Sequence, residues 1–180
     1  NIAIYGWIEG DHLQIVENEH IDQALNFIKI LQDIETPEFS KPASEACTSA
    51  EQLFHQIEER HKKLDSIENN ILQNFLNTIF KPLYLDVKNW STQQWPANNF
   101  HEILTTAKQT LSPSDFGIHN SIMRGDGTLC FLDLEYFGWD DPVKLIADFI
   151  WHTAMTLNED HKKRWVKNSF LIFKNGEELK

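Results

Sequence analysis

The chain has 180 residues with 41% hydrophobic and 24% charged side chains, and its formal net charge is -11. This balance predicts a single soluble globular domain with ample core. No run of about twenty apolar residues occurs, which excludes a membrane-spanning helix, and the negative charge argues against nucleic acid or an anionic membrane as a partner. Cys47 and Cys130 fit neither a disulfide framework nor a zinc site, so we expect a cytoplasmic protein.

The first part of the chain predicts a short extended piece and one helix. Residues 2–8 are expected to be extended. Apolar side chains then recur at helical spacing over residues 21–34, behind Asn18 as a cap, and Pro37 closes that helix. The proline-containing segment 35–43 is expected to be a linker.

Two apolar stripes predict further helices in the middle of the chain. The first covers residues 53–64 and is preceded by Thr48 and Ser49, either of which begins a capping box. The second covers residues 67–79 and is expected to stop at Pro82. The two stripes are expected to pack as an antiparallel pair or to form one kinked element.

The rest of the chain predicts three more helices around one hairpin. Residues 82–99 lack clean periodicity and are expected to be mostly loop, followed by a helix over 100–111. Later helices are expected to begin near Pro142 and to span residues 159–173. The fold class expected is mainly α, of the α+β type.

Residues 121–124 and 129–132 have strand character, and the Gly125-Asp126-Gly127 turn between them favours a hairpin. Folding that hairpin returns Asp133 to the neighbourhood of Asn120. Phosphoryl transfer needs a carboxylate near the acceptor hydroxyl and hard oxygen ligands for Mg²⁺. Asp115 is the candidate for the first role, and Asn120 and Asp133 are the candidates for the second. Taken alone, each of these residues is more commonly a turn residue that bonds its own backbone.

In spacing, these three residues resemble the aminoglycoside phosphotransferase and choline kinase-like superfamily, small-molecule relatives of the protein kinases. In that family a catalytic Asp is followed five residues later by an Asn, then by a hairpin and a metal-binding Asp. FLDLEY at 131–136 is similar to the family's metal-binding strand end and GWDDP at 138–142 to the turn after it, and IYGWIEG at 4–10 is similar to the hinge between the two kinase lobes.

The resemblance implies a hinge segment at residues 1–10 and a helical catalytic C-terminal lobe at 11–180, with a small β-hairpin carrying the metal site. It implies ATP and Mg²⁺ as cofactors and transfer of the γ-phosphoryl group to a hydroxyl of an aminoglycoside-, choline- or sugar-like molecule. The family's N-terminal ATP-binding lobe has no counterpart in these residues, since no Gly-rich phosphate loop occurs. We therefore expect little turnover from this chain by itself.

The chain departs from the family at the catalytic loop. Pro113 replaces the His usually found two residues before the catalytic Asp, and Ser114 stands where Gly is usual. The family's structural Asp falls on Leu145, and Asp148 lies about one helical turn further on. Supporting roles are assigned to three residues, namely His119, Glu135 and Asp148.

Three alternatives stay open at this stage. Asp115-Phe116-Gly117 spells the tripeptide that binds Mg²⁺ in protein kinases, but the Asn five residues on favours the catalytic-loop interpretation. The second alternative is a catalytically inactive kinase-like binding module. The third is a metal-dependent hydrolase, which needs more ligands, typically including His.

Overall fold

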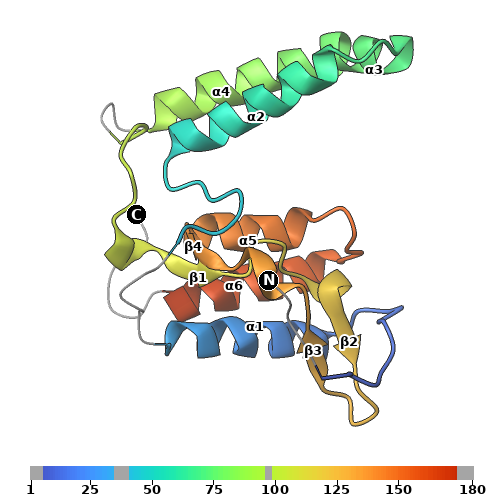
Figure 1. Cartoon of the computed structure of the whole chain (residues 1–180). Helices are drawn as coiled ribbons and strands as arrows, with labels where there is room; N and C mark the ends of the chain where they lie inside the picture. Colours follow the sequence, from blue (N-terminus) through green and yellow to red (C-terminus); the bar gives the residue numbers. More distant parts are fainter. Residues whose placement is uncertain (1–5, 35–40, 96–98, 174–180) are drawn as a thin grey trace. The chain divides into compact units, whose positions relative to one another are not determined.

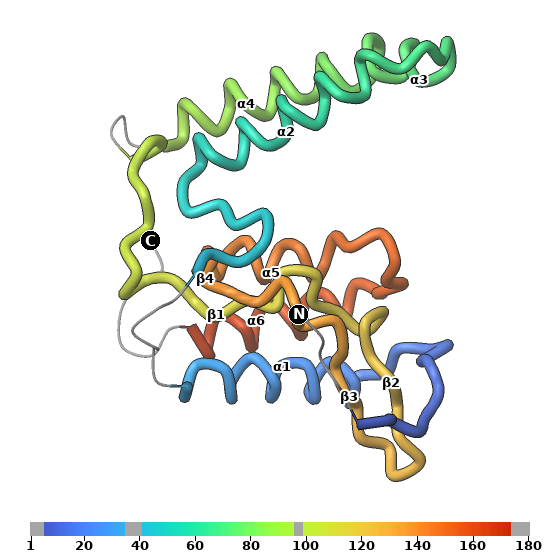
Figure 2. The backbone as a smooth tube through the Cα atoms, in the orientation of Figure 1, coloured from blue at the N-terminus to red at the C-terminus, as the bar shows by residue number. Residues whose placement is uncertain are grey.

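The computed structural model describes residues 6–34, 41–95 and 99–173, and helices make up 57% of this part. The mainly helical class with a small β part is confirmed. Contacts divide the chain into two compact units, Asn1–Ala46 with Lys108–Lys180, and Cys47–Ala107. Figure 2 follows the backbone out of the first unit and back into it. The segment 11–180, expected to be one lobe, therefore comprises parts of two units.

Three helices build the first unit: α1 (Asn18–Gln32), α5 (Pro142–Trp151) and α6 (Glu159–Phe173). Helix α6 packs against both α1 and α5 (Figure 1). Trp165 of α6 is fully buried, stacks on Phe149 with ring centroids 3.7 Å apart, and donates its indole N–H to the Ile146 carbonyl at 3.1 Å. Apolar side chains from the helices and the loops between the strands form one core cluster, which consists of Ile21, Ala24, Leu25, Ile28, Phe116, Ile118, Leu129, Leu145, Ile146, Phe149 and Trp165.

Two antiparallel two-stranded sheets flank these helices. Strands β2 (Ser121–Met123) and β3 (Leu129–Phe131) form the expected hairpin, in which Ile122 lies opposite Cys130. Gly127 in the turn has a φ of 82°, a conformation that glycine adopts without strain. The second sheet pairs β1 (Thr110–Ser112) with β4 (Gly138–Asp140).

Strand β1 corrects the helix expected over residues 100–111. The structure has only a short 3₁₀ turn at Thr106–Lys108 before the strand. The apolar spacing that suggested a helix does not correspond to a buried face, since Ile103 is 61% exposed while Leu111 is buried in the strand. Pairing with β4, more than 25 residues away, decides the conformation, and the local spacing does not encode that partner.

The second unit is a helical hairpin formed by α2 (Ala50–Asp65), α3 (Asn70–Phe75), a π-helical turn η1 (Leu76–Phe80) and α4 (Lys81–Gln94) (Figure 1). The Ser49 cap is confirmed because its hydroxyl accepts the Gln52 N–H at 3.2 Å. Phe54 of α2 meets Tyr84 of α4 edge to face, with ring centroids 5.9 Å apart. This contact pairs α2 with α4. Tyr84 lies beyond the second apolar stripe, whose Ile71 is 84% exposed, so how the two stripes pack stays a prediction.

Helix α4 corrects the loop expected over residues 82–99 and the helix stop expected at Pro82. Proline lacks an N–H and its ring clashes with the carbonyl four residues earlier in a regular α-helix. Here Pro82 stands in the first turn of α4, directly after the wider π-helical turn η1, so the chain stays helical through it.

The remaining helices agree with the sequence. Helix α5 begins at Pro142, capped by the Asp141 carboxylate, which accepts the Val143 N–H at 2.7 Å. Helix α6 has the expected bounds, and α1 begins at Asn18, with Glu17 instead of Asn18 as its cap residue. The predictions for residues 1–5, for 35–40 with Pro37, and for 96–98 lie outside the described residues. Within the described ranges, no helix combines the length and apolar character that crossing a bilayer requires.

Candidate functional site: the Asp115 loop and the hairpin

The loop that carries Asp115 connects β1 to β2 and is anchored by its own aromatic residue. Phe116 is 4% exposed and packs against the rings of Phe27 and Phe131, with centroids 5.2 and 4.9 Å away. Pro113 is fully buried, and its carbonyl accepts the Asp115 N–H at 3.1 Å. The loop is thus fixed on both sides of Asp115, whose side chain keeps 42% of its surface exposed.

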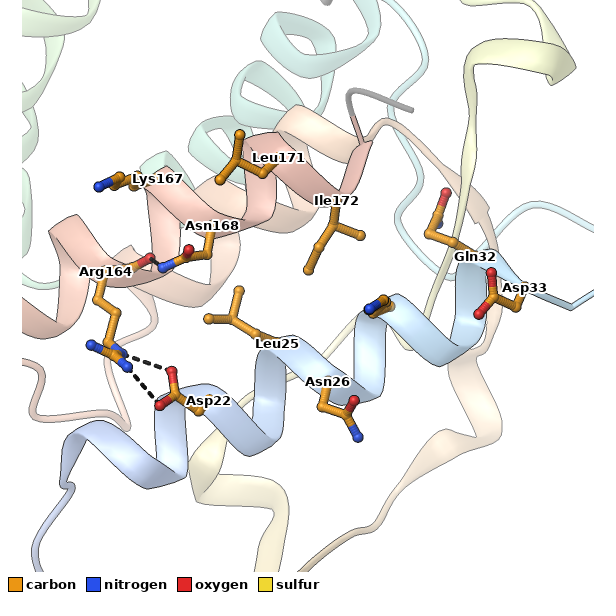
Figure 3. A pocket seen from close by; sticks show the side chains of 11 residues that line it. Asp22, Leu25, Asn26, Gln32, Asp33, Arg164, Lys167, Asn168, Leu171 and Ile172 are labelled. Carbon is orange, nitrogen blue, oxygen red and sulfur yellow. Dashed lines mark hydrogen bonds and ion pairs between the residues drawn. The ribbon is translucent and has the colours of Figure 1, made fainter. Parts of the chain in front are cut away.

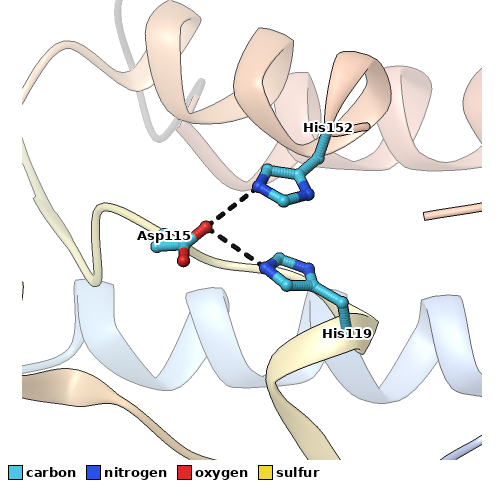
Figure 4. A group of neighbouring side chains, drawn as sticks. All are labelled: Asp115, His119 and His152. Atoms are coloured by element: carbon cyan, nitrogen blue, oxygen red, sulfur yellow. Dashed lines mark hydrogen bonds and ion pairs between the residues drawn. The ribbon is translucent and has the colours of Figure 1, made fainter. Parts of the chain in front are cut away.

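Three side chains surround the Asp115 carboxylate. The Asn120 amide donates to Asp115 Oδ2 at 3.1 Å and to the Asp115 carbonyl at 2.8 Å. Nε2 of His119 lies 3.2 Å from Asp115 Oδ1, and Nε2 of His152 lies 3.0 Å from the same oxygen (Figure 4). The two imidazole rings stack in parallel, with centroids 3.9 Å apart. His152 follows the last residue of α5, so the cluster joins two separate segments of the chain.

The charge states follow from these contacts. Burial opposes ionisation of Asp115, but the hydrogen bonds from Asn120 and His119 and the charges of both histidines outweigh it and lower the pKa of this carboxyl. Burial, followed by the neighbouring His152, lowers the pKa of His119 despite the opposing effect of Asp115. Near neutral pH the cluster therefore consists of a carboxylate and a neutral His119.

Asp133 comes two residues after strand β3, and the hairpin brings the residue before it, Leu132, to Asn120. The N–H of Leu132 donates to the Asn120 carbonyl at 2.8 Å, and Asp133 itself is exposed in the left-handed backbone conformation, with φ 57° and ψ 49°. The pKa of Tyr136 is raised first by its hydrogen bond with Glu135 and then by the charges of Glu135, Asp133 and Asp115. Asp115, Asp133 and the supporting residue Glu135 thus all act on the charge of one phenol.

The supporting residues fall in different places. His119 contacts Asp115 as described, whereas Glu135 is exposed and pairs with the Tyr136 hydroxyl. The Asp148 carboxylate accepts a hydrogen bond from Lys144 at 2.6 Å. Within the described ranges we find no hydrogen bond between Asp148 and the Asp115 loop, so its contacts do not add support to the role assigned to it from the sequence.

Asp115, His119 and His152 also form a group that is compact enough to hold a metal ion, since their ligand atoms lie within 4.8 Å of one another. The hydrogen bonds oppose this use. The Ala154 N–H donates to His152 Nδ1 at 3.2 Å, so that nitrogen carries the lone pair and the proton of neutral His152 is on Nε2. To bind a metal through Nε2, His152 would need a lone pair on Nε2 and its proton on Nδ1. His152 is therefore a donor to Asp115.

A mainly apolar cavity of about 640 Å³ adjoins Asp133. One wall is the segment expected to be the hinge, including Trp7, and the other consists of Ile122 and Leu132 from the hairpin. This segment is held by the next residue, Asp11, whose backbone N–H and carbonyl form hydrogen bonds with Met123 of 3.0 and 2.9 Å. The cavity therefore opens beside one predicted metal ligand.

A second cavity, of about 710 Å³, lies between α1 and α6 and contains none of the predicted site residues (Figure 3). Its Arg164 is bound by Asp22 through two hydrogen bonds of 2.7 and 2.6 Å. That guanidinium is therefore already paired with a carboxylate. Lys29, Lys167 and Asp33 also line the groove.

No protein-family model and no curated protein matches this chain. The kinase-like resemblance thus rests on the sequence motif alone. Sequence reasoning missed one member of the cluster, His152, which lies 37 residues after Asp115. No spacing signal identifies it, because only the packing of α5 brings its ring to the loop.

Proposed function

We propose that these residues form the catalytic part of an ATP- and Mg²⁺-dependent phosphotransferase that acts on a hydroxyl group of a small molecule. The observation that carries the proposal is the contact of Asn120 with the Asp115 carboxylate at 3.1 Å, together with the return of the hairpin to Asn120 through the Leu132 N–H. These two contacts support a general base at Asp115 and hard oxygen ligands at Asn120 and Asp133.

Each residue has a distinct role in this proposal. Asp115, held as a carboxylate, orients the acceptor hydroxyl and accepts its proton at or after the transition state. The Asn120 amide donates to Asp115 through Nδ2, which directs its Oδ1 away from that carboxylate and leaves it suited to a cation. In this proposal Asp133, which is exposed and follows the Leu132 that bonds Asn120, supplies the carboxylate.

The donor set fits Mg²⁺, which prefers a few carboxylate and amide oxygens and completes its shell with phosphate oxygens and water. Asn120 and Asp133 would hold the ion, and a bound Mg²⁺ neutralises charge on the phosphates. The cavity beside Asp133 supports a nucleotide as the second component. Its apolar walls and the 90% exposed Trp7 suit the flat face of a purine base.

Calorimetric titration of ATP into the full-length protein, with and without Mg²⁺, tests the assignment. We expect Asp133→Ala to lose the Mg²⁺-dependent part of the affinity. Asp115→Asn should keep that affinity and lower kcat by about a hundredfold to ten-thousandfold, because a general base typically contributes this much. Full-length protein without any metal-dependent ATP affinity would instead favour the inactive binding module, and parent-like behaviour of both variants would refute the roles.

A further inference from the structure

The Asp115 carboxylate receives more donors than its own loop provides. A carboxylate has about four lone-pair positions in its plane, two on each oxygen. Oδ1 is approached by the Nε2 atoms of His119 and His152, and Oδ2 is approached by the Asn120 amide. Among the donors in the described ranges, three positions are thus occupied, and the fourth lies on Oδ2.

The direction of the two histidine contacts is fixed by chemistry. A carboxylate oxygen only accepts, so each facing Nε2 must carry its proton. For His152 this agrees with the Ala154 N–H at 3.2 Å, which requires Nδ1 to be the acceptor. The backbone at the end of α5 therefore selects the tautomer that donates to Asp115, before any substrate is present.

The loop itself supplies two of these donors, from His119 and Asn120, and both follow Asp115 in the chain. Pro113 carries neither an N–H nor a side-chain donor, and its contact with Asp115 is through the backbone. Asp115 is 42% exposed, so packing alone does not fix its rotamer. The stacked imidazole rings of His119 and His152, whose centroids are 3.9 Å apart, are partly buried and lie on one side of the carboxylate (Figure 4).

We propose that His152 is a positioning residue for Asp115. Its Nε2–H holds Oδ1 of the carboxylate from outside the loop, so that Oδ2, through its remaining lone pair, is the atom that receives the proton of the acceptor. This inference rests on the proposed function. It goes beyond it by naming the reacting oxygen and by giving α5 a part in holding it.

The test compares two substitutions at His152 in the full-length protein. His152→Gln places an amide N–H close to the position of Nε2, whereas His152→Phe keeps a ring that can stack on His119 but donates nothing. With Mg²⁺-ATP as substrate and water as the acceptor, we expect His152→Phe to lower kcat about tenfold, the factor for one lost charge-assisted hydrogen bond. The KM for ATP should stay within about twofold, and His152→Gln should recover most of kcat.

His101→Phe is the matched control. His101 is 64% exposed and lies 3.0 Å from Glu51 in the other unit, so its replacement should leave both constants unchanged. Equal loss of kcat in His152→Gln and His152→Phe, or a change confined to KM, would overturn the positioning role.

A spectroscopic measurement separates this inference from the proposed function. The ¹⁵N chemical shifts of His152 should show the proton on Nε2, and Asp115→Ala should shift that nitrogen. A proton on Nδ1 would overturn the inference whatever the enzyme does. The expected shifts in a protein without Mg²⁺-ATP turnover would mean that the proposed function has failed, and the catalytic role of His152 with it.

Discussion

Gly10 provides the sharpest test of how the wall of the cavity beside Asp133 is held. Its φ is 153°, and a Cβ atom at this position would lie 2.3 Å from the Met123 carbonyl oxygen and 2.6 Å from Ile122 Cγ2. Those atoms belong to strand β2, against which the following residue, Asp11, forms its two backbone hydrogen bonds. Gly10→Ala therefore adds a methyl group where neither the backbone conformation nor the space allows one.

Two costs compete in this variant. Keeping the segment in place stores backbone strain of about 1–3 kcal/mol in addition to the clash. Releasing the segment gives up the two hydrogen bonds between Asp11 and Met123, each worth about 0.5–1.5 kcal/mol, or about 1–3 kcal/mol together. Because release also removes the clash, we expect the segment to leave β2 and the free energy of unfolding to fall by about 1–3 kcal/mol.

Hydrogen exchange of the Asp11 and Met123 amides measures this release directly. Both amides should exchange roughly tenfold to a hundredfold faster in Gly10→Ala, while amides in α6 change only as far as global stability does. Two other glycines serve as controls. A Cβ at Gly125 meets nothing within 4 Å, so Gly125→Ala should be neutral to about 0.5 kcal/mol.

Gly127 also has open space, but its φ is 82°. Gly127→Ala should therefore cost about 1–2 kcal/mol through backbone strain and leave the Asp11 amide protected. If the Asp11 amide in Gly10→Ala were as well protected as in the Gly125→Ala control, the reasoning from close approach would be wrong.

Two further predictions concern charge and backbone strain. Burial alone would lower the pKa of Lys144, but the carboxylates of Asp148 and Asp140 outweigh it and raise this pKa. The charged Lys144 therefore contributes its full stabilisation below pH 10.5, and this contribution is lost as the pH rises through the raised pKa. Lys144→Met should destabilise by about 3 kcal/mol, because Asp140 is 1% exposed and its carboxylate lies 3.3 Å from Lys144 Nζ. The exposed control Lys62→Met should change the urea midpoint little, and a Lys144→Met midpoint equal to that of the control would contradict the buried-pair argument. The φ of Ser114 is 71°, a left-handed conformation that glycine adopts more easily than alanine. Thermal unfolding should therefore show Ser114→Gly to be more stable than Ser114→Ala by about 1 kcal/mol, the reverse of their order in a helix. Equal stabilities of the two variants would argue against backbone strain at this position.

The sequence predicted those parts of the fold whose causes are local. Helix α6 has the expected bounds because its periodicity is self-contained, and the hairpin formed where Gly125 and Gly127 allow a tight turn. The same locality explains the errors. The apolar spacing over residues 100–111 predicted a helix, but the structure has strand β1 there, and no local sequence feature indicates its pairing with β4.

The candidate site divides in the same way. Asp115, Asn120 and Asp133 could be selected from spacing and turn chemistry, because a hairpin necessarily returns the chain to its starting point. Few residues separate them along the chain, so local turn chemistry is enough to predict that they approach one another. His119 could be named as a supporting residue for the same reason, because it immediately precedes Asn120 in the sequence.

The sequence by itself thus determined the helical class, the hairpin and the return of the chain to Asn120 through Leu132, since periodicity and turn residues act over short separations. Only the tertiary structure decided the β1–β4 pairing and the contact of His152 with Asp115. Both join segments that are distant along the chain, and their partners are chosen by the burial of one shared core around Trp165 and Phe116.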